Sequence, residues 1–127
     1  FRDWVAPYDI QVLAAAPSLV RIAHLHGEDA DPELIADYPV EVLSWSDKAS
    51  APTIPEAASR YGWVPMVGID ELTSLYWTPS EATAHVVQAR RAAGDRLIVA
   101  PNCTLHSDIN PLTLVGLRRG VDVALTY

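Results

Sequence analysis

The chain has 127 residues, of which 50% are apolar and 20% are charged, a composition typical of one globular domain that excludes a collagen, a coiled coil and a disordered tail. Nine Lys and Arg against sixteen Asp and Glu give a net charge of -7, so we expect neither nucleic acid nor a membrane surface as a partner. The single cysteine cannot form an internal disulfide, which is typical of a reducing compartment, and we expect the cytoplasm. Because the chain begins at Phe1 rather than at Met, we expect it to be a piece of a longer protein.

The first 16 residues predict an amphipathic helix that ends at Pro17. Its apolar side chains recur every three or four positions: Trp4, Val5, Tyr8, Val12 and Leu13.

Four short apolar runs, rich in Val, Ile and Leu, then predict buried parallel strands. They cover residues 19–25, 40–44, 64–69 and 97–100. Each run is followed by a polar turn and then by residues typical of a helix start.

The clearest of these helix starts is residues 78–81 (TPSE), where Thr78 and Glu81 have the spacing of a capping box. Gly94 is placed to end this helix. The other starts are residues 31–33 (DPE), 53–56 (TIPE) and 110–111 (NP).

This order of elements predicts an α/β fold with a parallel sheet and crossover helices. A closed (β/α)8 barrel needs roughly 250 residues, so residues 1–127 correspond to a single partial domain, with a first helix and four β/α units. Half a barrel leaves open strand edges and an uncovered apolar face, and we therefore expect the isolated chain to associate with itself.

Three residues suggest a metal site at the carboxyl edge of this sheet. His24 and His26 lie at the end of the first strand and point to the same face, because strand side chains alternate. Cys103 follows the fourth strand, at the edge where parallel α/β sheets gather their ligands. Two imidazoles and a thiolate with an open fourth position are typical of catalytic zinc. The alternative is a pair of packed histidines and a buried apolar cysteine.

The third strand ends in Gly68, followed by Asp70 and Glu71, and the second strand ends near Trp45. We expect Asp70 to be a catalytic residue that contacts the substrate, with Gly68 and Trp45 also lining the substrate site. A solvated turn and plain aromatic packing are the alternatives. Weaker candidates near the same edge are Glu28, Asp29, Asp31, His106 and Asp108.

Seven short motifs follow one another across almost the whole chain. They are residues 1–9 (FRDWVAPYD), 24–27 (HLHG), 34–39 (LIADYP), 43–45 (LSW), 68–70 (GID), 78–81 (TPSE) and 100–103 (APNC). In this order and spacing the chain resembles the C-terminal half of the uroporphyrinogen decarboxylase superfamily. That superfamily is similar in fold to a TIM barrel and includes the decarboxylase of haem biosynthesis and cobamide-dependent methyltransferases that act on thiols.

The resemblance to the methyltransferase branch implies that the full-length parent is an enzyme. It implies a zinc ion held by His24, His26 and Cys103, with His26 in place of a cysteine of that branch. The implied reaction transfers a methyl group from a methylcobamide, carried by a corrinoid protein, to a small thiol.

Two other functions remain open at this point. The first is porphyrinogen decarboxylation without a metal, although residues 101–103 (PNC) stand where that enzyme has a Gly-His-Gly turn. The second is a truncated domain without catalytic activity, whose only role is to pack against its missing half.

Overall fold

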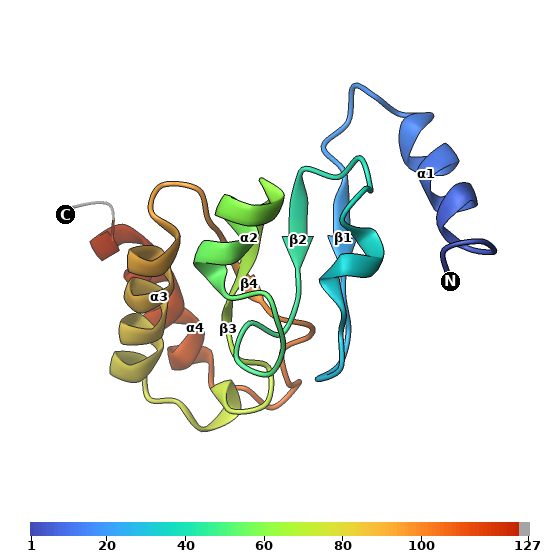
Figure 1. The fold of residues 1–127 in the computed structure, drawn as a ribbon. Coiled ribbons are helices and arrows are strands. Elements are labelled where there is room, and N and C mark those ends of the chain that lie inside the picture. The colour runs from blue at the N-terminus through green and yellow to red at the C-terminus, as the bar shows by residue number, and fades with distance from the viewer. Residues whose placement is uncertain (125–127) are drawn as a thin grey trace.

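The centre of the computed structural model, which describes residues 1–124, is a sheet of four parallel strands in chain order (Figure 1). The strands are β1 (Ile22–His24), β2 (Val42–Ser44), β3 (Val64–Ile69) and β4 (Ile98–Pro101). All four predicted strands are therefore confirmed, although β1 is shorter than the apolar run that contains it. Hydrogen bonding pairs His24 with Ser44 and Met66 with Ile98 across the sheet.

Four α-helices accompany the strands. They are α1 (Ala6–Ala14), α2 (Ile54–Tyr61), α3 (Pro79–Ala93) and α4 (Pro111–Ala124). Two single-turn 3₁₀ helices, η1 (Pro32–Ile35) and η2 (Ser74–Tyr76), lie in the loops after β1 and β3. In residues 1–124, no helix is both long enough and apolar enough to cross a membrane.

The helix starts predicted at Thr53 and Thr78 are confirmed as complete capping boxes, formed with Glu56 and Glu81 respectively. The predicted helix after Asp31 is wrong in length, because only η1 forms there. Asp31 does cap it by accepting a hydrogen bond from the backbone N–H of Glu33. Pro39 disfavours helical backbone at the preceding residue, and the chain leaves η1 for β2 instead.

One face of the sheet is covered by α2 and α3. Leu43, Trp45 and Val67 on this face pack against Ile54 and Ala57 of α2 and against Ala89 of α3. A second cluster joins β3 to α3 and α4, which pack closely against each other: Ile69, Ala82, Val86 and Leu117. The helices thus lie on one side of the parallel strands, as the crossover architecture predicts.

The other face is exposed along the two edge strands. Ile22 of β1 is 51% exposed and Ile98 of β4 is 40% exposed, and His24 lies on the same face of β1 as Ile22. Such a face is compatible with the inner surface of a partial barrel, although residues 1–124 do not close one.

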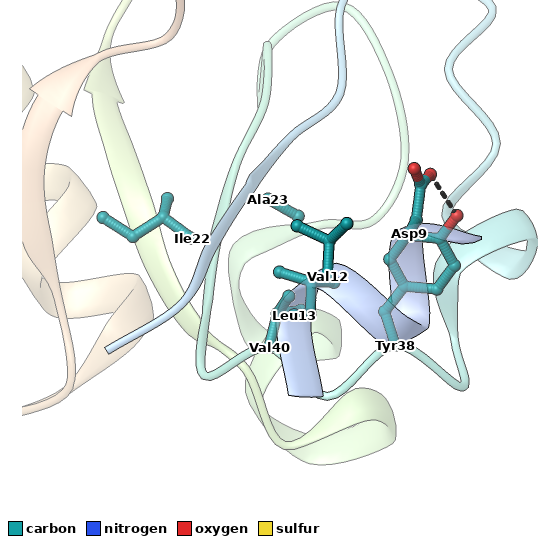
Figure 2. Close-up of a pocket in the computed structure, with 7 residues that line it drawn as sticks. All are labelled: Asp9, Val12, Leu13, Ile22, Ala23, Tyr38 and Val40. Carbon is teal, nitrogen blue, oxygen red and sulfur yellow. Dashed lines mark hydrogen bonds between the residues drawn. The ribbon is translucent and has the colours of Figure 1, made fainter. Parts of the chain in front are cut away.

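The first helix lies beside β1, far from α3 and α4 (Figure 1). It is shorter than predicted, and none of its residues is buried, with Val12 73% exposed. Together with β1 it borders an apolar groove of about 260 Å³ (Figure 2). Asp9 and Tyr38 line one end of this groove, where the hydroxyl of Tyr38 donates a hydrogen bond of 2.7 Å to Asp9.

Candidate metal centre

The two histidines of the site lie at the end of β1. His24 is the last residue of the strand, and His26 follows in the loop with its side chain on the same face. Their ring centroids are 6.0 Å apart, and both side chains are exposed. The strand therefore presents two imidazoles to the uncovered side of the sheet.

The cysteine reaches the same place from β4. That strand ends at Pro101, and the next residue, Asn102, fastens the following turn to β3. The backbone N–H of Asn102 donates to the carbonyl of Ile69 at 2.9 Å, and its side-chain oxygen accepts from the N–H of Gly68 at 3.3 Å. Asn102 is fully buried, and its two hydrogen bonds to β3 position the backbone of the next residue, Cys103.

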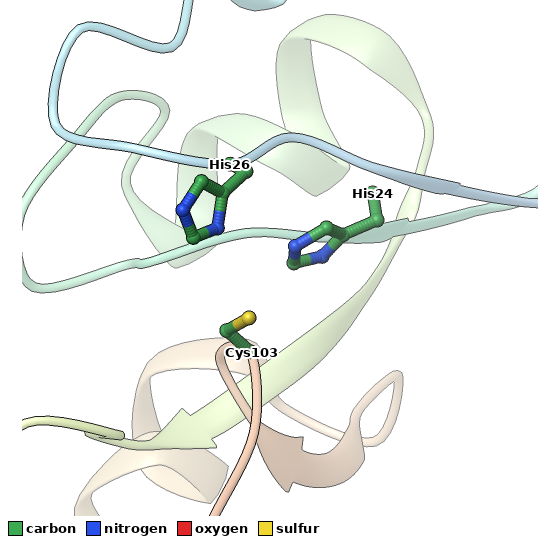
Figure 3. A group of neighbouring side chains, drawn as sticks. All are labelled: His24, His26 and Cys103. Carbon is green, nitrogen blue, oxygen red and sulfur yellow. The ribbon is translucent and has the colours of Figure 1, made fainter.

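The ligand atoms of His24, His26 and Cys103 all lie within 4.8 Å of one another, and the three side chains point toward a common space (Figure 3). Around a tetrahedral zinc with bonds of about 2.0–2.3 Å, ligand atoms are about 3.3–3.8 Å apart. The ligand atoms would have to approach one another by about 1 Å to bind one zinc ion. Small rotations of exposed side chains can supply this movement. The expected convergence of these residues is therefore confirmed.

The donor set is selective. Two imidazole nitrogens and one sulfur suit zinc, whereas calcium and magnesium prefer oxygen ligands. No carboxylate belongs to this group in the part of the chain that the structure describes. Three such residues would leave one position of a tetrahedral metal without a ligand from this group.

A buried hydroxyl lies directly beside one of the three converging side chains. Ser44 is the partner of His24 in the pairing of β1 with β2, and its Oγ lies 3.1 Å from Nδ1 of His24. Ser44 is only 7% exposed. The contact ties the imidazole to the sheet.

The acidic residues after β3 have other partners. The carboxylate of Asp70 accepts a hydrogen bond from the N–H of Leu72 at 2.9 Å and one from the hydroxyl of Thr73 at 2.7 Å. Glu71 accepts a hydrogen bond of 2.5 Å from Ser46. Asp70 is thus engaged in its own turn, and its predicted contact with a substrate stays a prediction.

Gly68 serves helix packing in this structure. Its φ is 111°, and a Cβ at this position would lie 2.9 Å from the Cβ of Ala89 on α3. The absent side chain therefore lets α3 approach the sheet, whereas the sequence suggested an approach by a ligand.

Trp45 lies on the face that the helices cover. It is fully buried, and its indole N–H donates to the carbonyl of Pro52 at 2.8 Å. The side chain packs in the core, away from the face that carries the histidines.

The weaker candidates lie outside the triad. His106 has a half-exposed side chain, and its Nδ1 accepts a hydrogen bond from the N–H of Asp108 at 3.2 Å. Asp31 caps η1, as described above. These residues have local structural roles.

Sequence reasoning missed Ser44 and Asn102. Ser44 could be found only from the register of β1 and β2, which the sequence does not show. Asn102 lies between Pro101 and Cys103, and an Asn directly after a strand and before the cysteine is the sequence signal that could indicate its role.

Comparison of the chain with protein-family models, with curated proteins and with solved structures finds no match.

Proposed function

We propose that His24, His26 and Cys103 bind one zinc ion, and that the protein to which this chain belongs uses it to transfer a methyl group from a methylated corrinoid to a thiol. The observation that carries the proposal is the convergence of one sulfur and two imidazole ligands within 4.8 Å at the carboxyl edge of a parallel sheet. The resemblance of the sequence motifs to thiol methyltransferases supplies the reaction class.

Zinc in such a site lowers the pKa of a coordinated thiol, so that the thiol is held as a thiolate at neutral pH. The chain contributes one negative ligand, Cys103, and two neutral ones, His24 and His26. A divalent zinc with this set carries a net charge of about +1, which favours an anionic fourth ligand such as a substrate thiolate. The exposure of both histidines leaves the approach to this position open.

The methyl transfer balances without an external oxidant. The thiol loses its proton to solvent, and its sulfur forms a bond to the methyl carbon. The carbon–cobalt bond breaks, and its electron pair stays on the cobalt of the corrinoid.

The direct test is a methyl-transfer assay with methylcobalamin as the donor and 2-mercaptoethanesulfonate as the acceptor. Loss of the methylcobalt absorbance and formation of the thioether are followed with the zinc-loaded chain, the chelated chain, Cys103→Ala and His106→Ala. We expect transfer with the zinc-loaded chain and His106→Ala, and none after chelation or with Cys103→Ala. Transfer that is equal in all four samples would refute the proposal.

A further inference from the structure

The hydroxyl of Ser44 lies beside His24, one of the three residues of the proposed zinc site. His24 and Ser44 face each other across β1 and β2, and both side chains lie on the uncovered face of the sheet. Nδ1 of His24 and Oγ of Ser44 are 3.1 Å apart, which is within hydrogen-bonding distance. Ser44 is buried whereas His24 is exposed, so the serine is the fixed partner and the imidazole is the group it can orient.

A neutral imidazole carries one proton, and the nitrogen without it is the one that binds a metal. The hydrogen bond of the other nitrogen selects between the two tautomers and sets the rotation of the ring. A serine hydroxyl can accept from Nδ1–H, and this leaves the lone pair of Nε2 free.

We propose that Ser44 is a positioning residue of the metal centre, whose buried hydroxyl accepts the Nδ1–H of His24 and presents Nε2 to the zinc. This inference rests on the proposed zinc site and adds the group that orients one ligand. A hydroxyl does so without adding charge, so the site keeps the net charge of about +1 that favours a thiolate. A carboxylate in the same place would cancel that charge.

The chain offers a matched control. Ser46 is also 7% exposed and lies two residues further along the same segment, but its hydroxyl donates to Glu71. Ser46→Ala therefore removes a buried hydroxyl of the same segment without touching His24. Ser44→Thr keeps the hydroxyl and suits a strand, because Thr is β-branched.

The experiment measures zinc affinity, by competition with a chromophoric chelator, for the unmodified chain, Ser44→Ala, Ser44→Thr and Ser46→Ala. Partners that orient metal-binding histidines are worth about 10- to 100-fold in metal affinity. We expect a loss of that size in Ser44→Ala, and changes of less than about threefold in the other two variants. Circular dichroism of each variant reports whether it is folded.

The tautomer of His24 is measured separately, by long-range ¹H–¹⁵N NMR of the metal-free chain in mildly alkaline buffer. We expect the Nδ1–H tautomer in the unmodified chain and its loss in Ser44→Ala. A chain with this tautomer that binds no zinc would refute the proposed function and leave the orienting role of Ser44 intact. An Nε2–H tautomer in the unmodified chain, or equal zinc affinity with and without the serine, would overturn the role of Ser44.

Discussion

Tyr38 and Asp9 join the first helix to the rest of the molecule: the phenolic hydroxyl donates a hydrogen bond of 2.7 Å to Oδ2 of the carboxylate (Figure 2). Removal from solvent, together with this hydrogen bond to a negative charge, raises the pKa of Tyr38 from 10.0 to about 12. The neutral phenol is thus favoured by the folded state.

Tyr38→Phe should lower the free energy of unfolding by about 1 kcal/mol, because it deletes this hydrogen bond and leaves the rest of the ring in place. The folded-state pKa is raised, so the contribution is complete below pH 10 and declines as the pH rises from 10 toward 12. Urea unfolding of both proteins at several pH values measures the difference. Tyr8→Phe, at a ring that is 65% exposed, is the control and should change little. A difference between the unmodified chain and Tyr38→Phe that does not shrink above pH 10 would contradict this assignment.

Gly116 permits the close packing of α4 on α3. A Cβ at this position would lie 2.8 Å from Cα of Pro79, which belongs to the backbone and cannot move out of the way as a flexible side chain could. Gly116→Ala should therefore force the helices apart and cost about 1–3 kcal/mol of stability, despite the higher helix propensity of Ala. Thermal and denaturant unfolding measure the effect. The control is Val115→Ala, one residue earlier and 62% exposed, which should change stability little. Equal stability of the two variants would show that α4 does not pack closely on Pro79 at Gly116.

Thr78 begins α3 by accepting a hydrogen bond from the backbone N–H of Glu81, and its own N–H and hydroxyl donate to the Glu81 carboxylate. Thr78→Ala should cost about 1 kcal/mol of stability, as loss of an N-cap usually does. These bonds also lower the pKa of Glu81 below its ordinary 4.5, so the stabilisation that they give is present above pH 4.5 and is lost as the pH falls through the lowered value. Urea unfolding at pH 7 and pH 3 checks both statements, with Ser80→Ala, two residues after the cap, as the control. A stability deficit of Thr78→Ala that is the same at both pH values would argue against the capping box.

The uncovered face of the sheet should make the isolated chain associate with itself. Ile22 is 51% exposed and Ile98 is 40% exposed, and within residues 1–124 the edge strands β1 and β4 each pair with one strand only. We expect light scattering after gel filtration to show a mass above the 13.8 kDa of one chain, and this mass should rise with protein concentration. Ile98→Asp should reduce this association, whereas Leu112→Asp, at an exposed position on α4, should not. A monomer at every concentration would contradict the prediction.

The parallel sheet could be predicted from the sequence because each strand is a short run of Val, Ile and Leu and each major helix has its own start signal. Thr53 and Thr78 form the capping boxes that their spacing indicates. The single turn at η1 was not predicted, because residues 31–33 (DPE) are typical of the start of a full helix, whereas Pro39 disfavours helical backbone at the residue before it.

The convergence of His24 and Cys103 could be predicted because parallel strands end at a common edge, although the two residues are 79 positions apart in the sequence. The roles of Gly68 and Trp45 could not be predicted from the sequence, because each depends on a contact with another part of the chain. Gly68 lies against Ala89, and Trp45 donates a hydrogen bond to Pro52. Alternation along a strand shows which residues share a face. It does not show which other element packs against that face.

Zinc binding by His24, His26 and Cys103 is the central proposal for this protein. The decisive measurement is the zinc content and affinity of the unmodified chain, His24→Ala, Cys103→Ala and the control His106→Ala, whose histidine is outside the group. We expect about one zinc per chain in the unmodified protein and in His106→Ala. Loss of one of three protein ligands should remove about 3 kcal/mol or more of the roughly 10–16 kcal/mol typical of protein zinc sites, so affinity should fall more than about 100-fold in the other two variants. No zinc in the unmodified chain, or full retention of zinc in both His24→Ala and Cys103→Ala, would contradict the account.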